Sequence, residues 1–148
     1  MALWQYAFWV VPKSSVLKTN GHIEKYLTEE IFNSKSFFDE NCSYDDFSTS
    51  ITYMEKNKHW CDDASLYGEY DSDCIEIYYK DNTRHIDSIH IRIDLRKEYY
   101  KLTVDKLIRS ILSSGFIIIN EDLNVLPVSE ESILDDIGKN KFLKFITE

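Results

Sequence analysis

Three features of the sequence predict an α+β fold. The stretch IDSIHIRIDLR at residues 86–96 alternates apolar and polar side chains, as a half-buried strand does. Two strand-like runs precede it, separated by short polar turns, and sequential strands of this kind form an antiparallel meander. Segments with apolar residues at helical spacing follow it. We therefore expect one domain over residues 1–148, with a largely antiparallel sheet of about five or six strands and helices mainly on one face.

The N-terminal third predicts one strand, one helix and a long loop. Residues 3–11 are apolar on both faces, which is typical of a strand buried on two sides, and Pro12 ends it because proline has no N–H to donate. Residues 23–31 have helical spacing, with Asn20 as the N-cap. Residues 32–64 are rich in Ser, Asn and Asp and show no long period, which favours a long loop with short helical pieces.

The middle of the chain predicts the meander. Residues 66–70 and 74–80 have the composition of strands and flank a turn at residues 71–73. A second turn at Asp81 and Asn82 leads into the long strand, residues 84–95. Three strands connected in this way lie side by side in one sheet.

The C-terminal part predicts two helices and two more strands. Residues 99–114 form a helix with one apolar face, and Gly115 suits its C-cap. Residues 116–119 are a buried strand, and residues 125–128 a short edge strand. Ser129 caps the last helix, which Gly138 ends. The inward face of this helix is expected to carry Ile133, Leu134 and Ile137.

Composition excludes several classes of function. No apolar run of about 18 residues is present, so we expect no membrane span and no membrane partner. Three unspaced cysteines predict neither a disulfide framework nor a metal site, and with no secretory signal in the N-terminal residues they favour the cytoplasm. Four isolated glycines leave no phosphate-binding loop, and we expect no cofactor. Basic residues do not alternate with aromatic ones, so we expect no binding of nucleic acid.

The net negative charge of the chain comes from one segment. Residues 37–76 hold eleven acidic side chains and two lysines, which accounts for the whole net charge of −9. Eight aromatic residues lie in the same segment, and such rings carry much of the binding energy at protein interfaces. Carboxylates around them would attract a basic protein. The residues predicted to bind this partner are Tyr44, Asp45, Asp46, Trp60, Asp62, Asp63, Tyr67, Glu69, Tyr70, Asp71 and Asp73.

The polar row of the long strand has three interpretations. His90, Arg92 and Asp94 project from one face, and Glu76 and Tyr78 of the preceding strand share it. A histidine beside an arginine and a carboxylate is suited to acid–base chemistry on a phosphoester. Cross-strand charge pairs on a solvated face explain the same pattern, as does a surface that holds a partner.

The opening LWQYAFWVVPK, a strand that ends in Pro-Lys, is similar to the start of small uncharacterised bacterial proteins. In size and composition the whole chain resembles immunity proteins of bacterial toxin systems, including contact-dependent inhibition and related polymorphic toxins. This resemblance implies a protein that binds one toxin domain, often a nuclease, and blocks it.

The leading hypothesis is therefore a non-catalytic inhibitor of a basic, nuclease-like toxin domain. The alternative is a small enzyme that acts on a phosphoester through His90, Arg92 and Asp94. A structural subunit whose acidic face binds another protein or a second copy of the chain, as a homodimer, is the third hypothesis.

Overall fold

The computed structural model describes residues 4–14, 47–49, 51–80 and 85–139. These residues form seven strands and two helices. The strands are β1 (Gln5–Pro12), β2 (Lys56–Asn57), β3 (Ala64–Gly68), β4 (Cys74–Tyr79), β5 (Ile86–Asp94), β6 (Phe116–Asn120) and β7 (Val125–Leu126). The helices are α4 (Tyr100–Ser114) and α5 (Glu130–Ile137). The helix expected at residues 23–31 lies outside the described residues.

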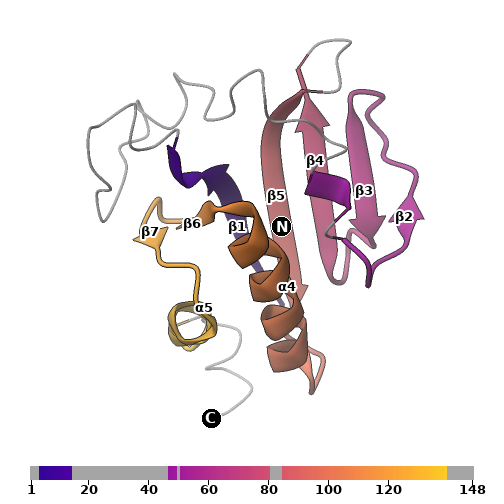
Figure 1. Cartoon of the computed structure of the whole chain (residues 1–148). Coiled ribbons are helices and arrows are strands. Elements are labelled where there is room, and N and C mark those ends of the chain that lie inside the picture. Colours follow the sequence, from indigo (N-terminus) through magenta and orange to yellow (C-terminus); the bar gives the residue numbers. More distant parts are fainter. Residues whose placement is uncertain (1–3, 15–46, 50, 81–84, 140–148) are drawn as a thin grey trace.

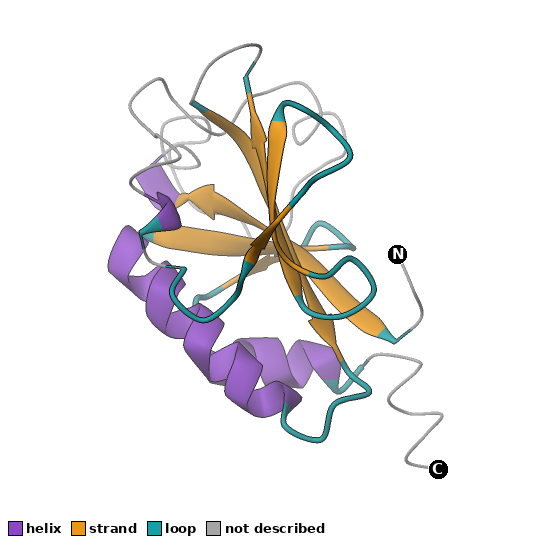
Figure 2. Ribbon diagram, turned by 90° about the vertical axis from the view of Figure 1, so that its right-hand side faces the viewer, coloured by secondary structure: helices purple, strands orange, loops and turns teal. Residues whose placement is uncertain are grey.

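All seven strands form one antiparallel sheet in the order β2-β3-β4-β5-β1-β6-β7. Both α4 and α5 lie against the same face of this sheet (Figure 1), and the sheet is strongly twisted above them (Figure 2). The α+β class is confirmed, with slightly more strands in the described part than expected.

The first strand is central because it is apolar on both faces. β1 pairs with β5 on one side and with β6 on the other. Phe8 faces the helices and is completely buried, and Ala7 on the opposite face is buried as well. Pro12 is the last residue of β1 and pairs with Phe116, so proline ends the strand as predicted.

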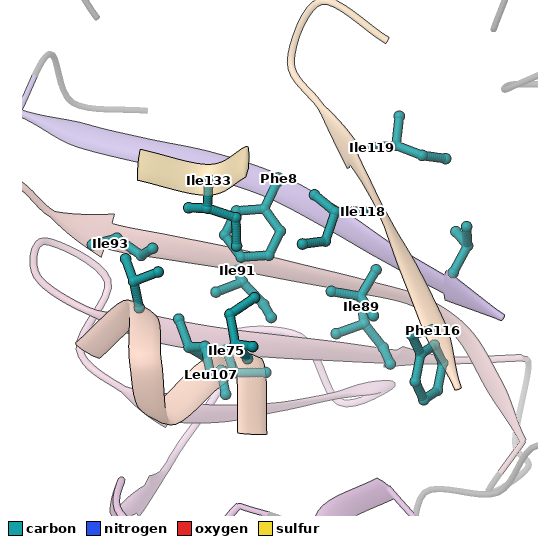
Figure 3. Packing of buried hydrophobic residues seen from close by; sticks show 14 of the residues in the cluster. Phe8, Ile75, Ile89, Ile91, Ile93, Leu107, Phe116, Ile118, Ile119 and Ile133 are labelled. Atoms are coloured by element: carbon teal, nitrogen blue, oxygen red, sulfur yellow. The ribbon is translucent and has the colours of Figure 1, made fainter. Parts of the chain in front are cut away.

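The core lies between the sheet and the helices. Ile89, Ile91 and Ile93 of β5 point into it with no exposed surface, which confirms the alternation of the long strand. Figure 3 shows these side chains around Phe8, with Leu107 of α4 close by. Each fully buried isoleucine stabilises the fold by roughly 1.5–3 kcal/mol.

The capping residues of both helices agree with the sequence prediction. Gly115 follows α4 with φ of 71°, the left-handed conformation that glycine adopts without strain. The Ser129 hydroxyl accepts a hydrogen bond from the Ser132 N–H at the start of α5, and Ile133 and Ile137 of α5 are buried. No helix in the described ranges is both long enough and apolar enough to cross a bilayer.

Several strand boundaries differ from expectation by one or two residues, and three of the differences have a clear physical reason. β2 lies inside the predicted loop, because two polar residues are too few to produce a strand pattern. β3 ends at Gly68, two residues before the predicted end, because the φ of 83° at Gly68 turns the chain out of the strand. β7 ends at Leu126, because the next residue, Pro127, has no N–H for the ladder.

Candidate functional site

The polar row of β5 lies in the middle of the sheet, on the face opposite to the helices. Its central residue, His90, pairs with Trp9 of β1 on one side and with Glu76 of β4 on the other. The rings of His90 and Trp9 are 4.9 Å apart between centroids. The row is therefore surrounded by side chains of neighbouring strands, and it is not at an edge.

The buried carboxylate of Glu76 lies at the centre of the contacts on this face. Glu76 is 2% exposed. Its carboxylate accepts hydrogen bonds from the Tyr78 hydroxyl at 2.7 Å and from His59 Nε2 at 2.9 Å, and it forms an ion pair with Arg92. His90 Nδ1 lies 3.9 Å from the same carboxylate. We call these five residues the Glu76 cluster.

Glu76 is expected to be ionised although its side chain is almost completely buried. Burial by itself raises the pKa of a carboxyl group, but the side chains of His90, Tyr78 and His59 and the charge of Arg92 act in the opposite direction. Together they hold the pKa of Glu76 well below its usual value of 4.5. The cluster therefore contains a fixed negative charge at neutral pH, neutralised by Arg92.

The imidazole of His90 lies between two carboxylates. Its Nε2 is 3.6 Å from Glu121 Oε1, and its Nδ1 faces Glu76. Burial acts to lower the pKa of His90, but these two carboxylates outweigh it and raise the pKa above 6.5. The two carboxylates thus favour the positive form of His90 relative to an ordinary imidazole.

Asp94 belongs to a different set of contacts from His90 and Arg92. Its carboxylate accepts hydrogen bonds from the Arg96 side chain at 2.9 and 3.0 Å and from the Ser72 hydroxyl at 3.1 Å. Burial tends to raise the pKa of Asp94, but the bonds from Arg96 and Ser72 lower it below 3.8. The structure brings His90 and Arg92 together around Glu76, while Asp94 joins the turn between β3 and β4.

The acidic segment is exposed only in part. Asp62, Asp63, Glu69 and Asp71 are exposed. Asp73 is half-buried and pairs with Lys97 at 2.9 Å. Within the described residues, Asp62, Asp63 and Glu69 form no ion pair. Tyr44, Asp45 and Asp46, which were also predicted to bind the partner, lie outside the described residues.

The three predicted anchors in the described part of this segment differ in exposure. Trp60 is 77% exposed and Tyr70 is 37% exposed. Tyr67 was predicted as a surface anchor, but it is 7% exposed and belongs to the core, because odd-numbered residues of β3 point towards the helices. Of the predicted anchors that the structure describes, Trp60 and Tyr70 are thus the ones available to a partner.

The two exposed rings lie close together. The Trp60 backbone N–H donates to the Tyr70 hydroxyl at 3.4 Å, and the centroids of both rings lie within 5.5 Å of the His59 ring centroid. Exposed carboxylates flank each ring in the chain. We call this set the Trp60 surface: Trp60, Asp62, Asp63, Glu69, Tyr70 and Asp71.

A groove of about 440 Å³ lies between the β3–β4 turn and the first turns of α4. Glu69 and Asp73 line it on one side, and Tyr99 and Lys106 line it on the other. Because the groove carries both charge signs and its Asp73 is already paired with Lys97, it does not define one class of ligand.

Neither cysteine chemistry nor a metal site is evident in the described part of the chain. Cys61 and Cys74 are free thiols, and burial raises the pKa of Cys74 although Arg92 lies near its sulfur. Among the described residues, no group of three or more metal-ligating side chains comes together.

No family model, curated protein or solved structure matches the chain. Function must therefore be inferred from the site. The residue that the sequence analysis missed is His59, which is buried and contacts Glu76 although its neighbours in sequence are polar or exposed. Glu76 and Tyr78 were expected on the face of the polar row, and the structure places them there.

Proposed function

We propose that the protein is a non-catalytic inhibitor that binds a basic protein through the Trp60 surface. Its partner would be a cognate bacterial toxin domain of the nuclease type, and both would act in the cytoplasm. The resemblance in size and composition to toxin-immunity proteins supports the class of partner. The exposed rings and carboxylates of the Trp60 surface support the mode of binding.

The observation that carries this proposal is the exposure of Trp60. An indole ring that is 77% exposed is costly to leave in water, and tryptophan is among the residues most enriched at binding hot spots. The ring of Tyr70, which is also exposed, packs against the same His59 ring as Trp60 does. A partner that covers both rings gains their burial without any rearrangement of the sheet.

Charge supports a basic partner. The exposed carboxylates of Asp62, Asp63 and Glu69 lie next to the two aromatic residues in the chain and form no ion pair in the described residues. Arg96 and Lys97 are engaged by the carboxylates of Asp94 and Asp73. A nuclease must be positive where it meets phosphate. Such a partner would be attracted to the Trp60 surface over about one Debye length.

A catalytic role for the polar row is less well supported by its contacts. Arg92 is paired with Glu76, and Asp94 is paired with Arg96. Neither group is left available for a substrate, so we assign the row to the structural network beneath the binding surface.

The experiment is to identify a secreted protein encoded next to this one, to purify its C-terminal domain with the protein and to measure association rates. The double variant Asp62→Lys, Asp63→Lys should associate about tenfold more slowly at low salt, with weaker salt dependence. Glu131→Lys, Asp135→Lys is the matched control, because it makes the same charge change on exposed positions of α5. It should slow association less than twofold.

Two results would reject the proposal. Failure of the basic domain to bind the unaltered protein would reject the class of partner. Equal association rates for the two double variants would show that the Trp60 surface is not where the partner docks.

A further inference from the structure

His59 is the one buried residue in an otherwise solvent-facing stretch, residues 55–63. It is 6% exposed, and its ring is enclosed by the rings of Trp60, Tyr70 and Tyr78, with centroids 5.3–5.5 Å away. Every other residue of the stretch is exposed or half-buried. Backbone hydrogen bonds hold the two ends of this stretch, through β2 and Glu55 at one end and Asp63 at the other, and His59 is the one buried side chain between them.

Both ring nitrogens of His59 have defined partners. The Cys61 N–H donates to Nδ1 at 2.9 Å, so Nδ1 carries no hydrogen. Nε2 lies 2.9 Å from Glu76 Oε2, so the hydrogen is on Nε2 and is donated to the carboxylate. A neutral imidazole has one donor and one acceptor, and this arrangement uses each of them once.

The two bonds have different consequences. The bond from Cys61 closes a local turn two residues along the chain, in the manner of an Asx turn, and Trp60 is the residue inside that turn. The bond to Glu76 fastens the turn to the centre of the sheet, where Arg92 and Tyr78 hold the carboxylate in place.

We propose that His59, as the neutral Nε2-protonated tautomer, is the positioning residue that holds Trp60 and its neighbouring carboxylates in the conformation that the partner binds. This inference rests on the proposed function, because it assigns a purpose to the order of the Trp60 surface. A preorganised loop binds more tightly because less conformational entropy is lost on association.

The first test needs no partner. Nitrogen-15 NMR of the unaltered protein at pH 7.5 should show a protonated Nε2 and an unprotonated Nδ1 for His59. Averaged nitrogen shifts, or the opposite tautomer, would overturn the assignment. This result is independent of whether any toxin domain binds.

The second test separates the two bonds. In His59→Asn, the shorter side chain can still accept from the Cys61 N–H but does not reach Glu76. In His59→Gln, the amide can still reach Glu76, but the local turn is lost. Hydrogen exchange of the Cys61 amide should accelerate at least tenfold in His59→Gln and less than threefold in His59→Asn. Equal exchange in the two variants would overturn the proposed division of roles.

The third test uses the partner domain. Both His59 variants should bind at least tenfold more weakly than the unaltered protein. Tyr6→Phe is the matched control, because it also removes a buried tyrosine donor to a carboxylate, that of Asp136 in α5, which is not part of the Glu76 cluster, and it should bind within twofold. If the unaltered protein binds and the His59 variants bind equally well, the positioning role is wrong while the proposed function stands.

Discussion

Replacing Glu76 with glutamine tests how strongly the buried charge holds the sheet together. The substitution keeps the volume of the side chain and removes its charge. Three donors then lose an ionised acceptor: the Tyr78 hydroxyl, the His59 ring and the Arg92 guanidinium. A hydrogen bond to a charged group contributes about 1.5–3 kcal/mol and a neutral one about 0.5–1.5, so each donor loses about 1 kcal/mol.

We therefore expect Glu76→Gln to lower the free energy of unfolding by about 3 kcal/mol at pH 7. This is the lower end of the roughly 3–5 kcal/mol expected when one partner of a buried ion pair is removed, because the Arg92 side chain retains 19% exposure to water. The assay is urea unfolding followed by circular dichroism with linear extrapolation.

The matched control is Glu121→Gln. Glu121 also faces His90, at 3.6 Å, but its side chain is 41% exposed, so its loss should cost less than about 1 kcal/mol. A loss of less than about 1 kcal/mol in Glu76→Gln as well would refute the reasoning, because it would show that the buried charge contributes nothing beyond a neutral amide.

The same carboxylate predicts sensitivity to acid. The pKa of Glu76 is lower in the folded protein than its usual value of 4.5, so its contribution to stability is complete above pH 4.5 and is lost as the pH falls below that value. The free energy of unfolding should fall by up to about 1.4 kcal/mol per pH unit from this group. In Glu76→Gln this component should disappear. Parallel pH profiles for the two proteins would contradict the ionised state of Glu76.

Three further predictions concern other positions. In urea unfolding, Gly68→Ala should lower the free energy of unfolding by about 3 kcal/mol or more, and Gly115→Ala by about 1–2 kcal/mol. Both glycines have positive φ, but only at Gly68 would a Cβ clash with backbone across the turn. Equal losses in the two variants would contradict this reasoning. The two neighbouring carboxylates raise the pKa of His90, although burial opposes them, so its proton NMR titration should have a midpoint above 6.5. The contribution of His90 to stability should be lost as the pH rises through that midpoint. A midpoint at or below 6.5 would contradict the arrangement. Tyr6→Phe should cost about 1.5–3 kcal/mol, because the buried hydroxyl donates to the Asp136 carboxylate at 2.6 Å, and an unchanged unfolding midpoint would show that this bond contributes nothing.

The strands were predictable where one face is apolar. The alternation from Ile89 to Leu95 and the two-sided apolar character of β1 follow from the contact of each side chain with one core, which leaves a clear pattern in the sequence. β2 has only two residues, both polar and exposed, and it pairs because β3 presents an edge to it. Nothing in its own sequence marks it as a strand.

The site was predictable in its residue types and less so in its contacts. The alternation placed His90 and Arg92 on one face, but only the order of the sheet brings them to Glu76 and separates them from Asp94. The burial of Tyr67 depends on which face of β3 meets the helices, and a short strand of mixed composition does not reveal it. Residues far apart in sequence determine these contacts.

The affinity of Trp60→Ala for the proposed basic partner domain tests the central claim most directly. Because the ring is 77% exposed, its removal should change the free energy of unfolding by less than about 0.5 kcal/mol. The dissociation constant should rise by about 30-fold or more, since a hot-spot residue contributes about 2 kcal/mol or more. Leu102→Ala, which removes a 52% exposed apolar side chain from α4, should leave the constant within twofold. Equal dissociation constants for Trp60→Ala and the unaltered protein would contradict the claim that the partner binds at the Trp60 surface.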